Sequence, residues 1–513
     1  MLAPLSSLVG AAASLKAPYL DYHALLPEIL LTGVILALLL ADLFLSEDNK
    51  HILVQLAGVG VLIPLIPIAT MVQHGITNHP RSMFVGAYVV DTFSLVLKAL
   101  FLIVGFVVVL ISSTYIEEGD YYEGEYSYLL LCSILGMVVM ASSRDLITIF
   151  VALELLSIPA YLLAGWRKRD VKSNEASLKY YLLGVLASAI MLYGMSLVFG
   201  MTGTTVLTEI GAKVAGSAGD QPLITLGIFL VLVGFAFKVS AVPFHQWAPD
   251  TYEGAPTPIT AFLSVASKTA GFVAIMQLVY VGFFGRNNVW GPLFWVLAAL
   301  TMTVGNLTAL RQTNIVRMLA YSSVAQAGYI LIPFAVAGDS IKASESALQA
   351  VVVYLVIYAL MNLGAFAVVI AVARRTRSGE ISSYGGMFTY APALTVVMTA
   401  FMISLAGIPI FGGWFAKLTV VRAILDAGTG TAVLLGILLA VNTVFAAFYY
   451  FSVVREMWFR PVPDGDVTPI VVPASLTVAI GICMTGVLVT GIVPGPVAQL
   501  GKKAAEALLA VHS

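Results

Sequence analysis

The chain has 513 residues, of which 60% are hydrophobic and only 10% are charged, whereas a soluble domain carries about 25% charged residues. Together with a mean hydropathy of +0.97, this composition excludes an ordinary soluble protein. The formal net charge of −1 gives no reason to expect a nucleic-acid partner.

The chain contains fourteen apolar segments that are long enough for membrane spans, because a transmembrane helix needs about 20 mostly apolar residues. In chain order they cover residues 24–44, 51–71, 91–113, 127–142, 145–165, 178–200, 223–243, 257–283, 290–308, 316–336, 347–373, 392–424, 431–453 and 470–492. They are apolar on every side, which predicts an all-α, polytopic integral membrane protein with about 14 transmembrane helices rather than a β-barrel. The longest loops are residues 72–90, 201–222 and 454–469, the acidic segment 115–126 predicts an interfacial loop, and residues 497–512 predict a short amphipathic helix.

Two segments of the chain resemble each other. Residues 173–194 match residues 343–364 without gaps, and Glu175 and Gly194 in the first copy meet Glu345 and Gly364 in the second. Five predicted spans separate the copies. Because that number is odd, the copies should cross the membrane in opposite directions, as in transporters built from inverted repeats.

Basic residues predict the orientation in the membrane. The two densest clusters are Arg167, Lys168, Arg169 and Lys172, and Arg374, Arg375 and Arg377. They follow the fifth and eleventh spans, and they therefore lie on the same side. Since loops rich in lysine and arginine stay in the cytoplasm, both termini are expected on the outer side.

Helix-breaking residues interrupt two of the spans. The seventh span reads FAFKVSAVPFHQW, with Pro243 five residues after Lys238. The twelfth reads GIPIFGGWFAK, in which Pro409 and two glycines precede Lys417. A break of this kind is tolerated where it is buried or lines a wet cavity. A packing kink would explain either break alone, but a lysine beside each break favours a functional site.

Ionisable residues lie deep in several spans, where each costs about 2.5–3.5 kcal/mol. They are Glu154, Lys238, Lys268 and Lys417, with Lys179 near the start of the sixth span. Structural ion pairs are the simplest explanation, but one carboxylate cannot neutralise three buried lysines. A buried lysine without a counter-ion releases its proton more easily than one in water. The set therefore predicts a proton relay.

Other charged residues give weaker signals. Lys98 lies about two turns into the third span, and a snorkelling side chain would explain it. A solvated location near a span end is expected for Glu28, Asp42, Asp91, Arg144 and Asp145. In the loop after the seventh span, His245, Asp250 and Glu253 could admit protons or order the loop.

No redox cofactor is expected in this chain. The two cysteines, Cys132 and Cys483, lie in apolar runs, and the sequence has no CxxC motif for an iron–sulfur cluster. The six histidines are His23, His51, His74, His79, His245 and His512. All are expected in loops or near helix ends, so a mid-membrane pair of haem ligands is not predicted.

Three segments carry a resemblance to a known family. VPFHQWAPDTYEGAPTPITAFLSVASK at 242–268, SNEASLKYYLLG at 173–184 and ALELLSIPAYLL at 152–163 resemble the proton-antiporter-like membrane subunits of NADH–quinone oxidoreductase (complex I). The form APDTYEGAP resembles the subunit N type rather than the L or M types. The likeness covers about residues 20–460.

The resemblance implies a fold of fourteen helices with two inverted five-helix repeats. Its expected segments are an N-terminal three-helix segment at 1–115, a first half-channel repeat at 124–285, a second half-channel repeat at 286–462, and a C-terminal helix and tail at 463–513. The mitochondrial form of this subunit lacks the first three helices, so the presence of these helices implies a bacterial or plastid source.

The resemblance also implies roles for five residues. Glu154 corresponds to the family's span-five glutamate and Lys238 to its partner in span seven, and we expect the two to form a buried ion pair. Lys268 corresponds to the bridging group of span eight, and Lys417 to the lysine of the second half-channel. Lys179 corresponds to the span-six lysine, whose role is less settled.

The implied activity is proton translocation driven by quinone reduction in neighbouring subunits. NADH, FMN, iron–sulfur clusters and quinone are expected in those partners, namely the M-, L-, K-, J-, A- and H-type subunits, within the lipid bilayer of a bacterial cell (inner) membrane. The alternatives are a subunit of a multisubunit cation/proton antiporter or membrane hydrogenase, a stand-alone solute transporter, and a purely structural membrane subunit. One mismatch concerns the repeat, whose 170-residue offset pairs Lys238 with Ile408 rather than with Lys417.

Overall fold

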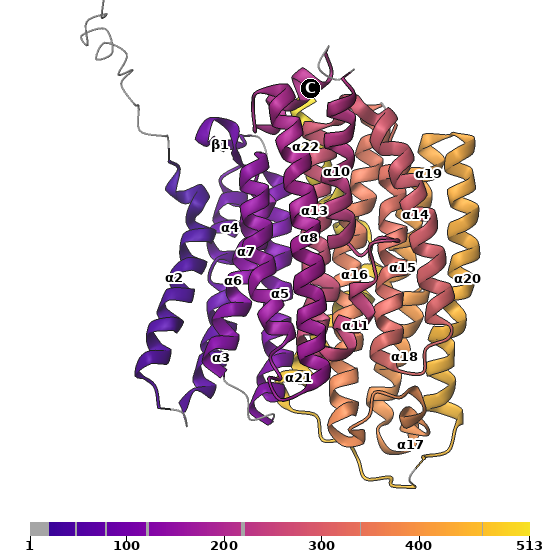
Figure 1. The fold of residues 1–513 in the computed structure, drawn as a ribbon. Coiled ribbons are helices and arrows are strands. Elements are labelled where there is room, and N and C mark those ends of the chain that lie inside the picture. The colour runs from indigo at the N-terminus through magenta and orange to yellow at the C-terminus, as the bar shows by residue number, and fades with distance from the viewer. Residues whose placement is uncertain are drawn as a thin grey trace, which may run out of the picture.

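The protein is a bundle of long helices that stand side by side (Figure 1). A computed structural model describes residues 20–46, 49–76, 79–118, 123–216, 221–338, 340–463 and 465–512. Residues 1–19 of the expected three-helix segment, and residues 119–122 of the expected interfacial loop, lie outside the described residues. Within the described ranges, 12 helical segments are long and apolar enough to cross a membrane.

The helices of the first half of the chain are α2 (Tyr22–Phe44), α3 (His51–Leu62), α4 (Leu65–Gln73), α5 (Thr92–Glu118), α6 (Glu123–Ser142), α7 (Leu146–Ala164), α8 (Val171–Thr202), α9 (Leu207–Val214), α10 (Pro222–Lys238) and α11 (Trp247–Gly254). One span follows from α12 (Thr257–Phe262) through the π-helical turn η4 (Leu263–Ser267) and α13 (Lys268–Gln277) to a second π-helical turn, η5 (Leu278–Gly282).

The helices of the second half are α14 (Asn287–Ala309), α15 (Ile315–Val336), α16 (Ile341–Thr376), α17 (Met387–Tyr390), α18 (Pro392–Ala406), α19 (Gly412–Ala427), α20 (Gly430–Phe459), α21 (Ala474–Ile492) and α22 (Gly495–Leu509). Short 3-10 turns are η2 (Phe84–Gly86), η6 (Phe284–Arg286), η7 (Ile381–Tyr384) and η8 (Ala510–His512). The loop expected at 72–90 contains a small antiparallel hairpin, β1 (Arg81–Met83) with β2 (Tyr88–Val90), in which Met83 pairs with Tyr88.

The seventh predicted span ends early, at the break after α10, and the twelfth is two helices rather than one. Residues 239–246 separate α10 from α11, and residues 407–411 separate α18 from α19. Gly407 ends α18 with a φ of 84°, a left-handed conformation that side-chain-bearing residues rarely adopt. The expectation of about 14 spans, with the seventh and twelfth interrupted, becomes for the described residues twelve long spans and two shorter apolar helices, α10 and α18, each of which ends at a break.

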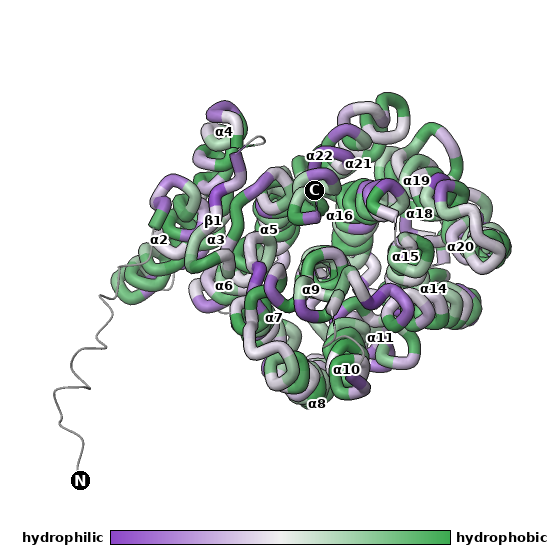
Figure 2. Tube along the Cα trace, turned by 90° about the horizontal axis from the view of Figure 1, so that it is seen from above, coloured by the Kyte–Doolittle hydropathy of each residue, from purple (hydrophilic) through white to green (hydrophobic). Residues whose placement is uncertain are grey.

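The most buried helices lie in the middle of the bundle. In the most apolar stretch of each span, all residues of Thr257–Gly282 and 89% of those of α16 are buried. In α8 and in α20 only 28% of the residues of that stretch are buried. Seen from above, α16 lies inside the bundle while α8 and α20 lie at its edges (Figure 2). In a membrane, the exposed sides of α8 and α20 must face lipid or other proteins.

The two copies of the internal repeat lie on antiparallel helices. Residues 173–194 belong to α8 and residues 343–364 to α16, and these two helices cross the bundle in opposite directions (Figure 1). The interrupted helices are also opposed, because α10 and α18 enter the bundle from opposite faces. This arrangement agrees with the expectation from the odd number of intervening spans.

Candidate functional site

Lys238 is the last residue of α10 and lies at the break in the helix. Its side chain is buried, with only 3% of the residue exposed. The ammonium nitrogen donates to Ser157 Oγ at 2.8 Å and to Tyr180 OH at 3.3 Å. Trp247 Nε1 satisfies a carbonyl at the end of α10 by donating to Phe237 O at 3.0 Å. Lys238 is thus held by neutral oxygens from α7 and α8.

The expected ion pair between Lys238 and Glu154 is not a direct contact, because no described hydrogen bond joins the two side chains, but the negative charge of Glu154 still acts on Lys238. Glu154 Oε1 instead accepts a hydrogen bond from Ser188 Oγ at 2.6 Å, and its side chain is only half-buried. On α7, Glu154 precedes Ser157 by three residues, so the two lie one above the other on one helix face. The hydroxyl of Ser157 therefore occupies the position at Lys238 that we expected for the carboxylate.

Lys268 follows the π-helical turn η4 in the central, fully buried span. Its ammonium donates to Ser323 Oγ of α15 at 2.6 Å and lies 5.8 Å from the ring centre of Tyr252. Only 2% of the residue is exposed. Single π-helical turns within α-helices are frequent at functional sites, and this one places Lys268 opposite the hydroxyl of Ser323.

Lys417 lies in α19, and the break before that helix supplies its main partner. The ammonium donates to Ala406 O, the last carbonyl of α18, at 2.8 Å and to Thr443 Oγ1 at 3.3 Å. It also lies 4.9 Å from the ring centre of Tyr329. Gly407 leaves room for the lysine, since a Cβ atom there would come within 2.6 Å of Lys417 Cδ.

A set of neutral side chains, here called the polar axis, connects the surroundings of Lys268 with those of Lys417. Ser322, next to the partner of Lys268, shares a 2.5 Å hydrogen bond with Tyr450 OH. One turn further along α15, Gln326 Nε2 donates to Tyr450 OH at 3.3 Å and to Leu405 O at 3.1 Å, and its Oε1 accepts from Tyr354 OH. Leu405 directly precedes the carbonyl of Ala406 that holds Lys417. The polar axis consists of Ser322, Ser323, Gln326, Tyr354 and Tyr450.

A second group of amides and hydroxyls lies on the other side of Lys417. Asn306 Nδ2 donates to Tyr329 OH at 2.9 Å and to Asn442 Oδ1 at 3.3 Å, while Tyr449 OH donates to Asn306 Oδ1 at 3.0 Å. Asn442 directly precedes Thr443, the second partner of Lys417. Lys417 is therefore bordered by hydrogen-bonded neutral groups on both sides.

Aromatic rings fill the space between Lys238 and Lys268. Trp247 stacks on Tyr180, with ring centres 4.5 Å apart and planes 12° apart, and packs edge to face on Tyr252 at 5.9 Å. Ser267 Oγ and Tyr252 OH are buried without a hydrogen-bond partner among the described residues. Aromatic rings and buried hydroxyls thus lie between the two lysines.

Lys179 does not lie with the three buried lysines. Its side chain is 41% exposed and pairs with Glu175 at 2.6 Å and with Asp250 at 2.7 Å. Asp250 and Glu253, for which we kept both proton entry and loop ordering open, belong to α11. There they pair with Arg317 of α15, each at 2.9 Å.

The expectations for Lys98 and Glu28 were wrong. Lys98 does not snorkel, because it is completely buried, and its ammonium pairs with Glu28 Oε1 at 2.6 Å. Tyr88 OH donates to the same carboxylate oxygen at 2.6 Å. Sequence position suggested helix ends, but the hairpin before α5 covers this end of the bundle and excludes water from the pair.

Three further residues expected at solvated span ends are also buried. Arg144 pairs with Asp91 at 2.9 Å, and 2% and 6% of these residues are exposed. Asp145 is the N-cap of α7 and accepts from the backbone amides of Ile147 and Thr148. These groups are satisfied within the protein and order the start of α7.

The repeat offset does not pair Lys238 with Lys417, because the two lysines lie on opposite sides of their helix breaks. Lys238 ends the helix before its break, whereas Lys417 lies on the helix after its break. The breaks themselves, 239–246 and 407–411, are separated by nearly the 170-residue offset of the repeat. The backbone therefore repeats, while the lysine has changed to the other half of the broken helix.

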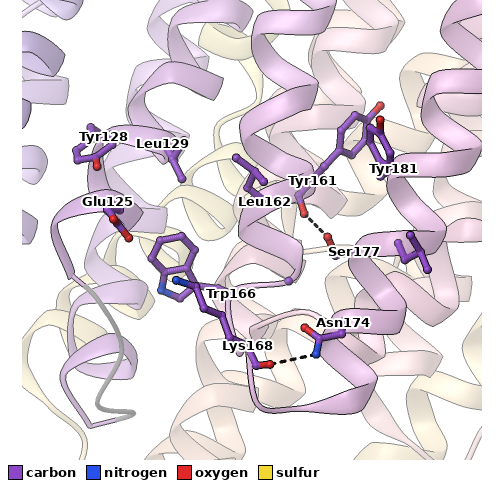
Figure 3. Close-up of a pocket in the computed structure, with 12 residues that line it drawn as sticks. Glu125, Tyr128, Leu129, Tyr161, Leu162, Trp166, Lys168, Asn174, Ser177 and Tyr181 are labelled. Atoms are coloured by element: carbon purple, nitrogen blue, oxygen red, sulfur yellow. Dashed lines mark hydrogen bonds between the residues drawn. The ribbon is translucent and has the colours of Figure 1, made fainter.

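A pocket of about 710 Å³ opens between α6, α7 and α8. Figure 3 shows Tyr161 and Tyr181 together at one end of the pocket and Trp166 with Lys168 at the other. Ser177 Oγ donates to Tyr161 O at 2.8 Å within it. Its lining residues include none of the five predicted site residues. The pocket therefore lies beside the lysines and does not enclose them.

Several residues of the site were missed by the sequence analysis. Ser157 could have been found from its position one helical turn after Glu154. Ser322, Gln326 and Tyr329 are spaced by four and three residues in the otherwise apolar span YSSVAQAGY, which is the spacing of one helix face. That polar stripe could have predicted the side of α15 that faces the lysines.

Comparisons with known proteins give consistent results. A family model described as NADH:quinone oxidoreductase/Mrp antiporter, TM, matches residues 143–443. The chain is 38% identical over 489 residues to NADH-quinone oxidoreductase subunit N of Trichlorobacter lovleyi, with coverage of 95% of this chain and 97% of the relative.

Solved structures share the fold. A chain of respiratory complex I from Thermus thermophilus is similar with a TM-score of 0.74 and 30% identity, with coverage of 92% of this chain and 98% of that one. A chain of the Mrp complex from Dietzia sp. has a TM-score of 0.82 at 21% identity, with coverage of 96% and 98%. The second likeness concerns the fold alone. The sequence identity over nearly the full length extends to subunit N proteins.

Proposed function

The chain belongs to the subunit N family of NADH-quinone oxidoreductase, and we propose that its buried lysines carry protons through the membrane for that complex. It is an antiporter-like, multi-pass membrane subunit of respiratory complex I and assembles with other membrane subunits. The alternative of a subunit in a cation/proton antiporter or membrane hydrogenase is not favoured, because the near-full-length identity is to subunit N proteins.

One observation carries the proposal: Lys238, Lys268 and Lys417 are all buried, and each is held by neutral oxygens instead of a carboxylate. An ammonium without a counter-ion in an apolar interior gives up its proton more readily than in water. Neutral hydroxyl and carbonyl partners can bind both the ammonium and the amine. Lys268 and Lys417 can therefore alternate between protonated and neutral states without leaving an unpaired carboxylate behind, while the carboxylate of Glu154 near Lys238 keeps its hydrogen bond from Ser188.

The proposed path runs from Lys238 to Lys268 and then along the polar axis to Lys417. The first step passes Ser267 and Tyr252, whose buried hydroxyls are the kind of group that internal water binds. The second step follows Ser323 and Gln326 to the break before α19. Glu154, one helical turn from Ser157, supplies a negative charge near Lys238, and its loss or neutralisation would make protonation of Lys238 less favourable.

Further parts of the proposal concern the surroundings of the chain. The two basic clusters, one at the junction of α7 and α8 and one at the end of α16, support a bacterial cell (inner) membrane orientation with both termini outside. We expect contacts with the M-, L-, K-, J-, A- and H-type subunits. We also expect NADH, FMN, iron–sulfur clusters and quinone to be bound by partners, with no redox group in this chain.

The test is substitution of Lys238 in the assembled complex. Lys238→Ala removes the proton carrier, and Lys238→Arg keeps a charge that is not released, because a guanidinium has a pKa above about 12. Both variants should lose NADH-driven acidification of vesicles when compared at equal content of assembled complex. Wild-type acidification by Lys238→Arg would leave Lys238 as a purely structural cation and refute the relay.

A further inference from the structure

The short helix α11 lies between the surroundings of Lys238 and those of Lys268. Its first residue, Trp247, stacks on Tyr180, and the hydroxyl of Tyr180 accepts from Lys238. Its Tyr252 ring lies 5.8 Å from the ammonium of Lys268. A shift of α11 would therefore move a contact of each lysine at the same time.

This helix cannot keep its position by itself. It has 8 residues, and isolated helices shorter than about 12–15 residues are marginal in water. The break at 239–246 precedes it, and the extended residue Ala255 follows it. Its position must therefore be set by contacts with neighbouring helices.

Most residues of α11 are buried against the neighbouring helices, and ion pairs add contacts to both flanking helices. We call the members of these ion pairs the α11 anchor: Lys172, Lys179, Asp250, Glu253 and Arg317. From α8, Lys179 pairs with Asp250 at 2.7 Å and Lys172 pairs with Glu253 at 3.2 Å. From α15, Arg317 Nη1 pairs with both carboxylates, each at 2.9 Å. Each carboxylate of α11 is thus bound from two helices.

Arg317 differs from the other cations of the α11 anchor in where it comes from. It lies on α15, the helix that also carries Ser323, the partner of Lys268. Arg317 therefore connects α11 with the helix that binds the second lysine, whereas Lys172 and Lys179 connect it with α8. Arg317 is also the member of the anchor that contacts both Asp250 and Glu253.

We propose that Arg317 is a positioning residue for proton transfer between Lys238 and Lys268. By holding Asp250 and Glu253 it keeps Trp247 and Tyr252 in place between the two lysines, and it keeps α11 aligned with α15. This inference rests on the proposed function, because it assigns Arg317 to one step of that path.

The α11 anchor is not needed to hold the bundle together. The side chain of Arg317 is 31% exposed, and those of Asp250 and Glu253 are 35% and 26% exposed, and ion pairs of this kind contribute little to global stability. Loss of two such pairs corresponds to roughly a two- to thirtyfold change in the ratio of correctly placed to displaced α11. Proton transfer should therefore fall while the complex still assembles.

The experiment compares Arg317→Gln with Arg311→Gln in the assembled complex. Arg311 lies in the turn between α14 and α15, is exposed and takes part in no described ion pair, so it is a matched control. In reconstituted vesicles, acidification per NADH oxidised should fall in Arg317→Gln, by at most roughly thirtyfold for the part carried by this subunit. It should stay at the wild-type level in Arg311→Gln. Equal acidification by the two variants would overturn the proposal.

Two further variants separate positioning from a general structural role. Arg317→Lys should recover part of the acidification, because an ammonium can pair with one carboxylate at a time, and no recovery would count against the proposal. In a background of Asp250→Asn with Glu253→Gln, adding Arg317→Gln should have no further effect, because coupled residues are not additive. Additive losses would overturn it.

The Lys238→Arg variant, measured in the same assay, separates this inference from the function on which it rests. If Lys238→Arg acidifies vesicles normally, the relay itself is refuted. If it does not, but Arg317→Gln acts like Arg311→Gln, only the positioning role of Arg317 is refuted.

Discussion

The buried pair of Lys98 and Glu28 allows a test of whether a charge inside this bundle is structural. Removal of one partner from a buried ion pair destabilises a protein by about 3–5 kcal/mol, because the other charge stays buried and unpaired. Lys98 is completely buried and 2.6 Å from Glu28, so Lys98→Met or Glu28→Gln alone should lower the amount of assembled complex. Replacement of the whole group by apolar residues of similar size should be close to neutral.

The informative variant changes three residues together: Glu28→Leu, Lys98→Met and Tyr88→Phe. The tyrosine is included because its hydroxyl donates to Glu28 and would otherwise be left buried without a partner, at a cost of about 1–3 kcal/mol. Native gels should show normal content of assembled complex and normal resistance to heat, and vesicles should acidify as in the wild type. Normal assembly with loss of acidification would show that the pair serves proton transfer, and the structural reasoning would fail.

Two more substitutions test individual contacts. Glu154→Gln keeps an oxygen that can accept from Ser188 but removes the charge, so assembly should be normal and acidification should fall; full acidification would reduce Glu154 to a structural residue. Gly407→Ala should impair acidification, because its Cβ atom would meet Lys417 in addition to a strain of about 1–2 kcal/mol from the left-handed backbone. Gly428→Ala is the control, since its φ of +63° brings the same strain without contact to a lysine. Equal losses of acidification in the two glycine variants would contradict the role of the contact between residue 407 and Lys417.

The sequence predicted the parts of this protein that depend on local chemistry. Long apolar runs form helices in lipid because every backbone group must be hydrogen-bonded internally. The spans could therefore be predicted from the sequence. The breaks were visible because proline and paired glycines stand out in such runs. Lys238, Lys268 and Lys417 were visible because a buried lysine is costly and rare.

Contacts between distant segments could not be predicted in the same way. Lys238 and Ser157 are 81 residues apart in the chain, and their meeting depends on how α7 and α10 are rotated against each other. Glu154 and Ser157 share one face of α7, so which of them meets Lys238 also depends on how far the two helices are shifted along their axes, and the expected direct pair with Glu154 could not be checked from the sequence. The solvent exposure of Lys98 and Glu28 was predicted from their distance to a helix end. That distance gives no information on which other segments cover the helix end.

The two broken helices also give the lysines a counter-charge that no side chain provides. The carbonyls at the C-terminal end of a helix carry a partial negative charge equivalent to about half an electron. The ammonium of Lys417 binds the last carbonyl of α18 and so faces such an end, and Lys238 belongs to the last turn of α10. This backbone charge neither gains nor loses protons as the pH or the membrane potential changes. The attraction for the ammonium is therefore constant, and only the mobile proton and its neighbours change the state of the lysine.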